Sequence, residues 1–416
     1  MYRNLPKSIY SLAFINFING FGNFVFPFLT LFLTLKLGYS SADAGYFMMI
    51  SMAMYVPGSL LTSKIADKVS RKKIMLISQA LFSFTFLVCG IIYDYKEIIP
   101  YVILLTFFFD GATDPARQAL HTDHTNFDNR QESFSLFYLA YNIGFGIGPA
   151  IAGLLFNSYP RLLFLIAGGF GLLVTFIIAF TIDDKKPDAQ MIEDSIKNNQ
   201  TDKAVEGNVF KALMARPKLL TYIVITGIFF LCVSIVLFLL PLYSTASFGE
   251  KGPTIYGFLM STNAVTVVII TPFIVKLTHK KNTLTVMVIS FILYLLGFNI
   301  LTITAVAIIF GLGVIVFSVG ESVHATNNDY FVANHTPLGH RARFSTIVNI
   351  IQGTGYAVGP YISGLLLDTY SYKQVIHIVS AVVLFCVLAM LYLRHTYIRD
   401  GETIVPTNET EQAISE

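Results

Sequence analysis

The sequence predicts an all-α membrane protein with twelve transmembrane helices in two pseudo-symmetric six-helix bundles. The composition is the first observation behind this prediction, because hydrophobic residues make up 54% of the 416 residues and charged residues only 13%. Ordinary soluble domains have about 25% charged residues. The second observation is the recurrence of long apolar stretches, and the third is an internal repeat that relates the two halves of the chain.

Twelve apolar stretches have about the 20 residues that a helix needs to cross the hydrocarbon core of a bilayer. The first half contains six, at residues 10–36, 44–66, 74–93, 100–122, 135–157 and 162–182. The second half contains the other six, at residues 220–244, 254–277, 285–302, 305–330, 343–367 and 374–394. Only a short junction near residues 299–304 separates the ninth stretch from the tenth.

The polar residues divide the chain into domains and set its orientation. We expect an N-terminal bundle at residues 1–182, a polar linker at 183–218, and a C-terminal bundle with a short tail at 219–416. Most of the 28 Lys and Arg residues fall on the side of the termini and the linker. Because cytoplasmic loops carry the excess of Lys and Arg, both termini, the linker and the tail are predicted to be cytoplasmic. The predicted location is the cell (plasma or inner) membrane.

The internal repeat has an offset of 211 residues. Residues 141–155 read Y-N-I-G-F-G-I-G-P-A-I-A-G-L-L, and residues 352–366 read Q-G-T-G-Y-A-V-G-P-Y-I-S-G-L-L. Small residues in an apolar helix allow a neighbouring helix to approach closely. We therefore expect a helix-packing role for Gly144, Gly148, Pro149 and Gly153, and for Gly355, Gly359, Pro360 and Gly364.

The same offset places Asp110 on Glu321, and both acids lie in apolar stretches. Ionisable residues within a membrane are costly and usually functional. A low-dielectric site disfavours the charged carboxylate, so both acids are predicted to take up and release protons, and a cationic substrate would compete with the proton for the same charge. Asp114 follows Asp110 by four residues and His324 follows Glu321 by three, so each lies one helical turn away and joins the predicted proton-coupling set. The alternative is that an acid only hydrogen-bonds a neighbouring helix.

Candidate substrate-binding residues lie on four of the predicted spans. Asn16, Asn19 and Asn23 recur every three to four residues and form a polar stripe on the first span. Aromatic and thioether side chains suit a cavity for apolar cations. The remaining candidates are Tyr138, Tyr141 and Asn142 on the fifth span, Met52 on the second, and Asp110 itself. Helix–helix contact or packing against lipid is the alternative for each of them.

Two motifs carry a resemblance to a known family. Residues 63–73 read S-K-I-A-D-K-V-S-R-K-K, which resembles the G-x-x-x-D-R/K-x-G-R-R/K signature of the major facilitator superfamily, with serines replacing both glycines. Residues 144–153 are similar to the G-x-x-x-G-P-x-x-x-G motif of its drug:proton antiporter branch. The resemblance implies a cytoplasmic latch between the two halves, formed by Asp67, Lys68, Arg71 and Lys72, with Asp123 as a plausible partner. Alternatively, this basic cluster only sets the topology.

The fourth span departs from the pattern of that branch. Antiporters of this branch often have R-x-x-Q-G here, whereas this chain has F-F-F-D-G, with Phe107 in the place of the arginine and Asp110 in the place of the glutamine. Arg117 lies further along, nearer the cytoplasmic end. The arginine-based coupling of the branch is therefore not carried over, and the chain resembles antiporters whose membrane carboxylates take the proton directly.

These observations predict a proton-driven exporter of hydrophobic or cationic compounds that works as a monomer in the lipid bilayer. We assign coupling chiefly to Glu321, beside His324, and the substrate charge to Asp110, where Gly111 leaves room for a bulky cation. A transporter of one dedicated metabolite (a sugar, peptide, lipid or metal chelator) is the alternative, and a non-transporting sensor is another. The sequence has no H-E-x-x-H, G-x-S-x-G or His/Cys cluster, so we expect no enzyme, cofactor, metal site or nucleic-acid partner.

Overall fold

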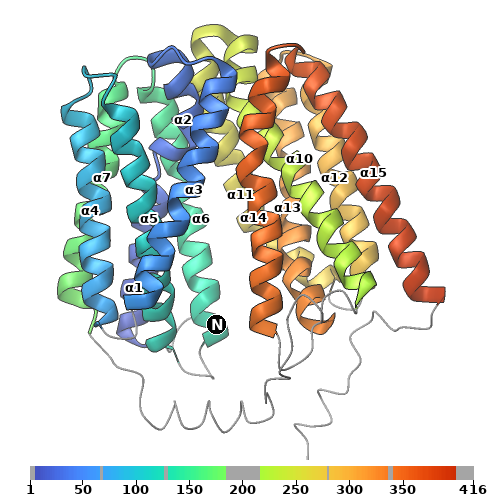
Figure 1. The fold of residues 1–416 in the computed structure, drawn as a ribbon, viewed down its shortest axis with the longest axis horizontal. Coiled ribbons are helices and arrows are strands. Elements are labelled where there is room, and N and C mark those ends of the chain that lie inside the picture. Colours follow the sequence, from blue (N-terminus) through green and yellow to red (C-terminus); the bar gives the residue numbers. More distant parts are fainter. Residues whose placement is uncertain are drawn as a thin grey trace, which may run out of the picture. The chain divides into compact units, whose positions relative to one another are not determined.

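The structure, a computed structural model, describes residues 5–65, 69–125, 130–183, 216–278, 281–335 and 341–399. In these ranges the regular structure is helical and contains no strand (Figure 1). The all-α class predicted from the sequence is confirmed. The predicted linker lies almost wholly outside the described residues.

The first half of the chain forms a series of long helices that follow the predicted spans closely. A π-helical turn, Phe32–Lys36, follows α2. The helices are α1 (Lys7–Phe21), α2 (Val25–Leu31), α3 (Ser41–Ile65), α4 (Arg71–Ile91), α5 (Ile99–Asp123), α6 (Arg130–Leu155) and α7 (Pro160–Thr181).

The second half repeats this series. Adding 211 to the bounds of α6 gives 341–366, and α14 spans Arg341–Leu367. The junction near residues 299–304 ends α12 at Ile303, and α13 begins at Ala307. The helices are α10 (Pro217–Phe248), α11 (Gly252–Thr278), α12 (Thr283–Ile303), α13 (Ala307–His335), α14 (Arg341–Leu367) and α15 (Tyr372–Arg399).

The first predicted span is not one continuous helix. The chain leaves helical geometry between Phe21 and Val25, where the backbone N–H of Phe24 donates to the carbonyl oxygen of Gly22 at 2.8 Å. Glycine in a helix interior destabilises it by about 1 kcal/mol relative to alanine, which favours a break at Gly22. Broken helices in membrane proteins occur where the backbone is enclosed by protein or lines a cavity. The break exposes Asn23 to the interior of the bundle.

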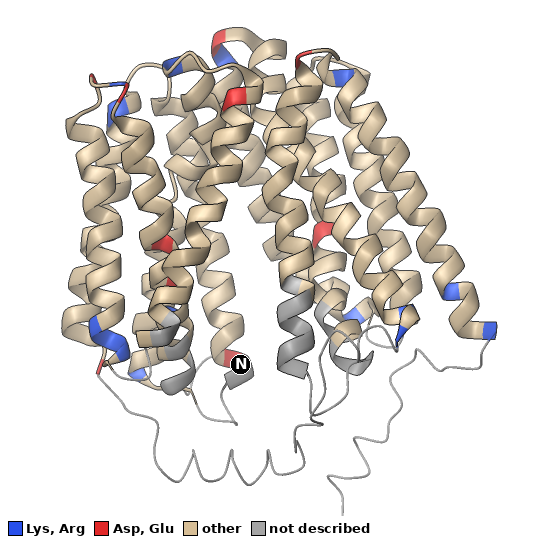
Figure 2. Ribbon diagram, in the orientation of Figure 1, with Lys and Arg blue, Asp and Glu red and all other residues tan. Residues whose placement is uncertain are grey.

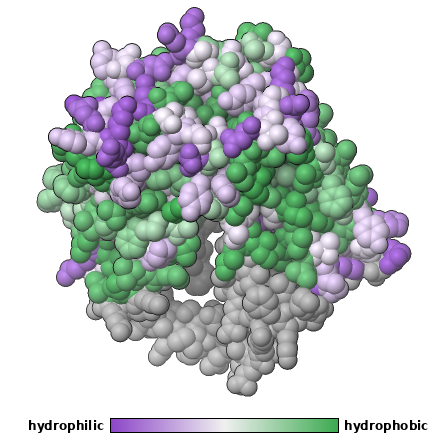
Figure 3. Space-filling view, turned by 45° about the horizontal axis from the view of Figure 1, so that its top comes forward, coloured by the Kyte–Doolittle hydropathy of each residue, from purple (hydrophilic) through white to green (hydrophobic). Residues whose placement is uncertain are grey.

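The described helices have the surface of a multi-pass membrane protein. Nine helical stretches are long and apolar enough to span a bilayer, and one of them, Pro217–Thr278, contains both α10 and α11. Lys, Arg, Asp and Glu gather near the helix ends in Figure 2 and are sparse between them. In Figure 3 hydrophilic residues gather over the upper part of the visible face, and hydrophobic residues cover much of the surface below them. Several large apolar side chains are exposed, as expected of side chains that face lipid. Phe180 and Ile308, for example, are each 75% exposed.

Contacts divide the chain into two compact units whose limits differ from the two expected halves. The first unit contains residues 1–193 together with 237–265 and 359–370, and the second contains 194–236, 266–358 and 371–416. Glycines explain why two later segments belong to the first unit. A Cβ on Gly153 would meet the carbonyl oxygen of Pro253 at 2.7 Å, and one on Gly45 would clash with the carbonyl oxygen of Pro360.

Within the first unit, α1 packs on α6, α3 packs on α5, and α4 packs on both α5 and α7. The α1–α6 crossing is tight because glycines face backbone across it. A Cβ on Gly144 would clash with the carbonyl oxygen of Phe17, and one on Gly148 would clash with that of Phe21. This close approach holds the α1–α2 break against α6 and so positions the polar residues of α1.

Candidate functional site

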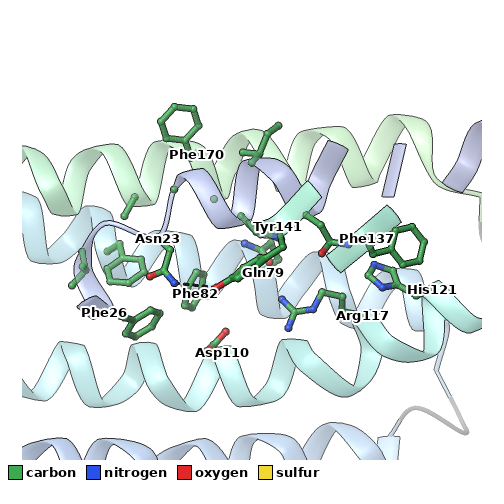
Figure 4. Close-up of a pocket in the computed structure, with 18 of the residues that line it drawn as sticks. Asn23, Phe26, Gln79, Phe82, Asp110, Arg117, His121, Phe137, Tyr141 and Phe170 are labelled. Carbon is green, nitrogen blue, oxygen red and sulfur yellow. Dashed lines mark hydrogen bonds between the residues drawn. The ribbon is translucent and has the colours of Figure 1, made fainter. Parts of the chain in front are cut away.

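The first unit encloses a cavity of about 450 Å³ between α1, α4, α5, α6 and α7 (Figure 4). This volume falls in the range of small-molecule sites, about 300–1,000 Å³. Its polar lining comes from Asn16, Asn19, Asn23, Gln79, Asp110, Arg117, His121, Tyr138 and Tyr141. Its apolar lining includes Phe26, Phe82, Phe86, Phe134, Phe137 and Phe170.

Helix α5 supplies the charged groups of this cavity. Asp110, Arg117 and His121 are spaced by seven and four residues, which places them on one face of a helix. Figure 4 shows Asp110 and Arg117 extending from the same helix toward Gln79 and Tyr141. The guanidinium of Arg117 interacts electrostatically with the Asp110 carboxylate. The cavity therefore presents one acid and one base on a single helix face.

A second acid, Asp114, holds the guanidinium in place. Arg117 Nη2 forms an ion pair with Asp114 Oδ1, and Gln118 Nε2 donates to Asp114 Oδ2 at 2.9 Å. The Tyr55 hydroxyl on α3 also hydrogen-bonds Asp114. Asp114 is 20% exposed and is not a lining residue. Because the Asp114 charge is matched by Arg117, ionised Asp110 leaves the cluster with one net negative charge.

Tyr55 reaches Asp114 because α3 and α5 cross closely. A Cβ on Gly58 would clash with the carbonyl oxygen of Phe108, and one on Gly111 would clash with that of Tyr55. The sequence interpretation that Gly111 leaves room for a bulky cation was therefore wrong. This glycine faces α3, and its lack of a side chain serves helix packing beside Asp110.

Several buried polar atoms on the lining residues have no hydrogen-bond partner in the protein. They are Asn19 Nδ2, Asn23 Oδ1, Gln79 Nε2 and His121 Nε2. Gln79 is 3% exposed and His121 is 6% exposed. An unsatisfied buried polar group costs about 1–3 kcal/mol, so these four groups must bond either water or a polar ligand in the cavity.

Aromatic rings form the ends of the cavity. Phe26 contacts Phe82 and Phe86, with ring centroids 6.3 and 5.7 Å apart. At the other end, the rings of His121 and Phe137 lie 4.3 Å apart. Asn23 Nδ2 donates to the Tyr141 hydroxyl at 3.2 Å and so ties the α1–α2 break to α6. The cavity combines apolar walls with a few oriented polar groups.

The structure brings together only part of the predicted substrate-binding set. Asn16, Asn19, Asn23, Asp110, Tyr138 and Tyr141 all line the cavity. Met52 and Asn142 are not among its lining residues, and Asn142 Nδ2 instead donates to the carbonyl oxygen of Tyr138 at 2.8 Å. Sequence reasoning set Arg117 aside and did not select Gln79 or His121. The spacing from Asp110 predicts Arg117 and His121 on its face, and an amide in the apolar run of α4 is itself unusual.

Glu321 and His324 lie in the second unit, and their surroundings differ from the predicted relay. Glu321 interacts electrostatically with Tyr294 on α12 and Tyr356 on α14. The His324 ring lies among phenylalanines of α10, with centroids 5.6 Å from Phe229 and 4.9 Å from Phe230. His324 Nε2 is buried without a hydrogen-bond partner.

Most of the predicted latch falls outside the described residues. Asp67 and Lys68 lie there, as does the side chain of Asp123. Arg71 is the first residue of α4. Lys72 Nζ donates to the carbonyl oxygen of Ala179 at 2.8 Å, near the C-terminal end of α7, where a cation is favoured. This bond lies within the first unit, whereas the predicted latch would join the two halves of the chain.

No group of three or more metal-ligand side chains was found among the described residues. The chemistry available in the cavity is therefore that of Asp110, Arg117, His121 and the surrounding amides and hydroxyls.

Comparisons with known proteins agree with this architecture. A family model described as Major Facilitator Superfamily matches residues 12–319 and 250–415. An uncharacterized MFS-type transporter, YttB of Bacillus subtilis (strain 168), is 23% identical over an alignment that covers 89% of this chain and 91% of that protein. A Na(+), Li(+), K(+)/H(+) antiporter of Planococcus maritimus is 23% identical, with coverage of 81% and 84%. The crystal structure of nucleoside transporter NupG superposes with a TM-score of 0.74 at 16% identity and covers 93% of this chain and 99% of that one.

Proposed function

The chain belongs to the Major Facilitator Superfamily, and we propose that it is a proton-coupled secondary transporter that exports hydrophobic or cationic small molecules by alternating access. The observation that carries this proposal is the Asp110 carboxylate in the lining of an aromatic-walled cavity, beside an Arg117 whose charge is paired with Asp114 outside the lining. A cavity of this kind suits an apolar cation, because the carboxylate matches its charge and the rings attract it through their faces.

The ion pair of Arg117 with Asp114 leaves the cluster with one net negative charge, and this charge is on Asp110, where a cation can bind. If Arg117 were unpaired, its charge would offset Asp110 and the cavity would be neutral. Its ion pair with Asp114, supported by Tyr55 and Gln118, keeps the two charges together. A cation entering the cavity therefore meets Asp110 as the group whose charge is not already matched.

Proton coupling follows from competition for Asp110. A proton and a cationic substrate each neutralise the same carboxylate, so binding of one favours release of the other. We assign a second protonation step to Glu321, the repeat partner of Asp110, with Tyr294 and Tyr356 as the groups around it. In this division Asp110 binds the substrate charge, and Glu321 carries the chief part of the coupling to the pH gradient.

The remaining features of the proposal extend the family's architecture to this chain. We place twelve spans in two six-helix bundles, at residues 1–182 and 219–416, with the linker and both termini on the cytoplasmic side of the cell membrane. The G-x-x-x-G-P-x-x-x-G motif supports assignment to the drug:proton antiporter branch. We also propose a cytoplasmic latch, whose disruption slows the change between inward-open and outward-open states. Its residues are Asp67, Lys68, Arg71, Lys72 and Asp123. We expect the monomer to be functional.

The experiment that tests the proposal is substrate-dependent proton movement. Purified protein in liposomes, with an imposed pH gradient and a trapped pH-sensitive dye, is given tetraphenylphosphonium. We expect proton flux that depends on this cation and is lost in Asp110→Asn, because an amide keeps the shape of the side chain but cannot take up a proton. Proton flux that no lipophilic cation stimulates would contradict the proposal and favour a transporter of one dedicated metabolite.

A further inference from the structure

The cavity of the first unit is polarised along its length. Phe107, one turn before Asp110 on α5, contacts Phe26 with ring centroids 4.9 Å apart. The Asp110 end of the cavity is thus the end where Phe26 and Asn23 lie (Figure 4). Two hydrogen-bond acceptors lie at this end, the Asp110 carboxylate and the unpartnered Asn23 Oδ1, while Asn23 Nδ2 is already engaged with the Tyr141 hydroxyl. This end suits a protonated amine.

The opposite end offers donors. Arg117 lies seven residues beyond Asp110, about 10 Å along the helix axis. One guanidinium nitrogen bonds Asp114, and the group has further N–H donors at the cavity wall. His121, one turn further, brings its buried Nε2 to the same end. Between the two ends, Gln79 Nε2, buried and without a partner, adds a further donor from α4 (Figure 4). These groups suit a carboxylate or another strong acceptor.

From this polarity we infer that the substrate is amphoteric: an apolar or aromatic body with a protonated amine at one end and a carboxylate or comparable acceptor at the other. The inference rests on the proposed function and narrows its substrate class. A simple cation would satisfy Asp110 and leave the Arg117 and Gln79 donors unmet. An amphoteric molecule satisfies both ends, and sites that hydrogen-bond a substrate group reject analogues that lack it.

The first part of the test compares three probes that share one ring. They are 4-(2-aminoethyl)benzoic acid, which carries both charges; its methyl ester, which keeps only the amine; and 4-ethylbenzoic acid, which keeps only the carboxylate. Binding to the purified full-length protein in lipid nanodiscs is measured by calorimetry. We expect the amphoteric probe to bind roughly tenfold or more tightly than either singly charged probe, as one charge-assisted hydrogen bond provides.

The second part uses variants at the donor end. Arg117→Gln removes the guanidinium, and Gln79→Met removes a donor while leaving the Asp114–Arg117 pair intact, which guards against a simple folding defect. Both should weaken binding of the amphoteric probe by about tenfold more than they change binding of the methyl ester. Equal binding of the ester and the amphoteric probe by the natural protein would overturn the inference. So would equal weakening of both probes in both variants.

The outcomes separate this inference from the proposed function. If the ester and tetraphenylphosphonium bind in a manner that depends on Asp110, while the carboxylate adds nothing, the substrate class is wrong and the cation exporter stands. If neither cation binds and only 4-ethylbenzoic acid does, both proposals fail. If none of the three ring probes binds but tetraphenylphosphonium does, the inference alone is overturned.

Discussion

At position 19 the first unit has an asparagine, and 211 residues later the second unit has Phe230. Asn19 Nδ2 is buried without a partner and lines the cavity. Phe230 instead packs edge-on against His324, with ring centroids 4.9 Å apart. The two halves share one helical framework, yet the same position lines a cavity in one unit and packs against an aromatic ring in the other.

The same contrast holds deeper in the two units. Arg117 corresponds to Asn328, and Tyr141 corresponds to Gln352. Asn328 Oδ1 accepts hydrogen bonds from the Tyr222 hydroxyl at 3.0 Å and from Gln352 Nε2 at 3.2 Å. These buried side chains of the second unit satisfy one another by hydrogen bonds and so fix the packing of their helices. In the first unit the corresponding residues line a cavity instead. The repeat therefore preserves the helices, while the side chains at matching positions differ between the two units.

The largest expected effect comes from the acids that the repeat places on each other. Asp110→Asn should weaken binding of tetraphenylphosphonium by roughly 10- to 100-fold, because a charged partner is lost from an enclosed site. Glu321→Gln should retain that binding and abolish transport driven by a pH gradient. Equilibrium binding and proteoliposome flux measure the two properties separately. Equal loss of binding in both variants would show that the units do not divide the work.

Exchanging the residue at position 19 tests the comparison directly. Asn19→Phe, which copies the second unit, should fill part of the cavity and lower the affinity for tetraphenylphosphonium at least tenfold with little change in thermal stability. Asn142→Phe is the matched control, because Asn142 lies on α6 but does not line the cavity. If both variants lose affinity to the same extent, the cavity is not the binding site.

A smaller effect, on stability alone, is expected at the helix crossings. Gly144 corresponds to Gly355, and a Cβ on either would meet a backbone carbonyl oxygen, that of Phe17 or of Gly227. Gly144→Ala and Gly355→Ala should each destabilise the protein by about 1–3 kcal/mol, seen as a lower melting temperature in detergent. Gly353→Ala is the control, since nothing lies within 4 Å of its Cβ position. Similar melting temperatures for all three would show that these crossings can relax.

The smallest effect is expected from Tyr55→Phe. This change removes one hydrogen bond to Asp114 and should cost about 1 kcal/mol of stability, because Arg117 and Gln118 still hold that carboxylate. Affinity for tetraphenylphosphonium should change less than threefold, by the same estimate of a single neutral hydrogen bond. A loss of affinity comparable with that of Asp110→Asn would mean that Tyr55 contacts the substrate.

The sequence predicted the helices and the acid of the cavity but only part of its wall. Asp110 and the asparagines of α1 stand out because polar groups are rare in apolar spans. The phenylalanines of α4 do not, because these spans are apolar on all sides and hydrophobicity alone does not reveal which face of α4 looks inward. That face is set by the packing of α4 on α5 and α7.

Two further differences have local causes. The break at Gly22 was missed because the hydrophobic run continues through it, so that composition reads as one span. The relay from Glu321 to His324 rested on spacing along one helix. In the structure, the ring of His324 packs against Phe229 and Phe230 of α10. Residue spacing along α13 does not predict these contacts, because they are made with another helix.

The central claim is that the substrate binds in the cavity of the first unit, and photolabelling tests it most directly. An azide derivative of tetraphenylphosphonium is cross-linked to the purified protein, and the labelled peptides are identified by mass spectrometry after chymotrypsin digestion. We expect the label on α1, α4, α5 and α6, near Asn23, Phe82, Asp110 and Tyr141, with excess unlabelled cation or Asp110→Asn removing it. Specific labelling confined to α10, α12, α13 and α14 would contradict the account.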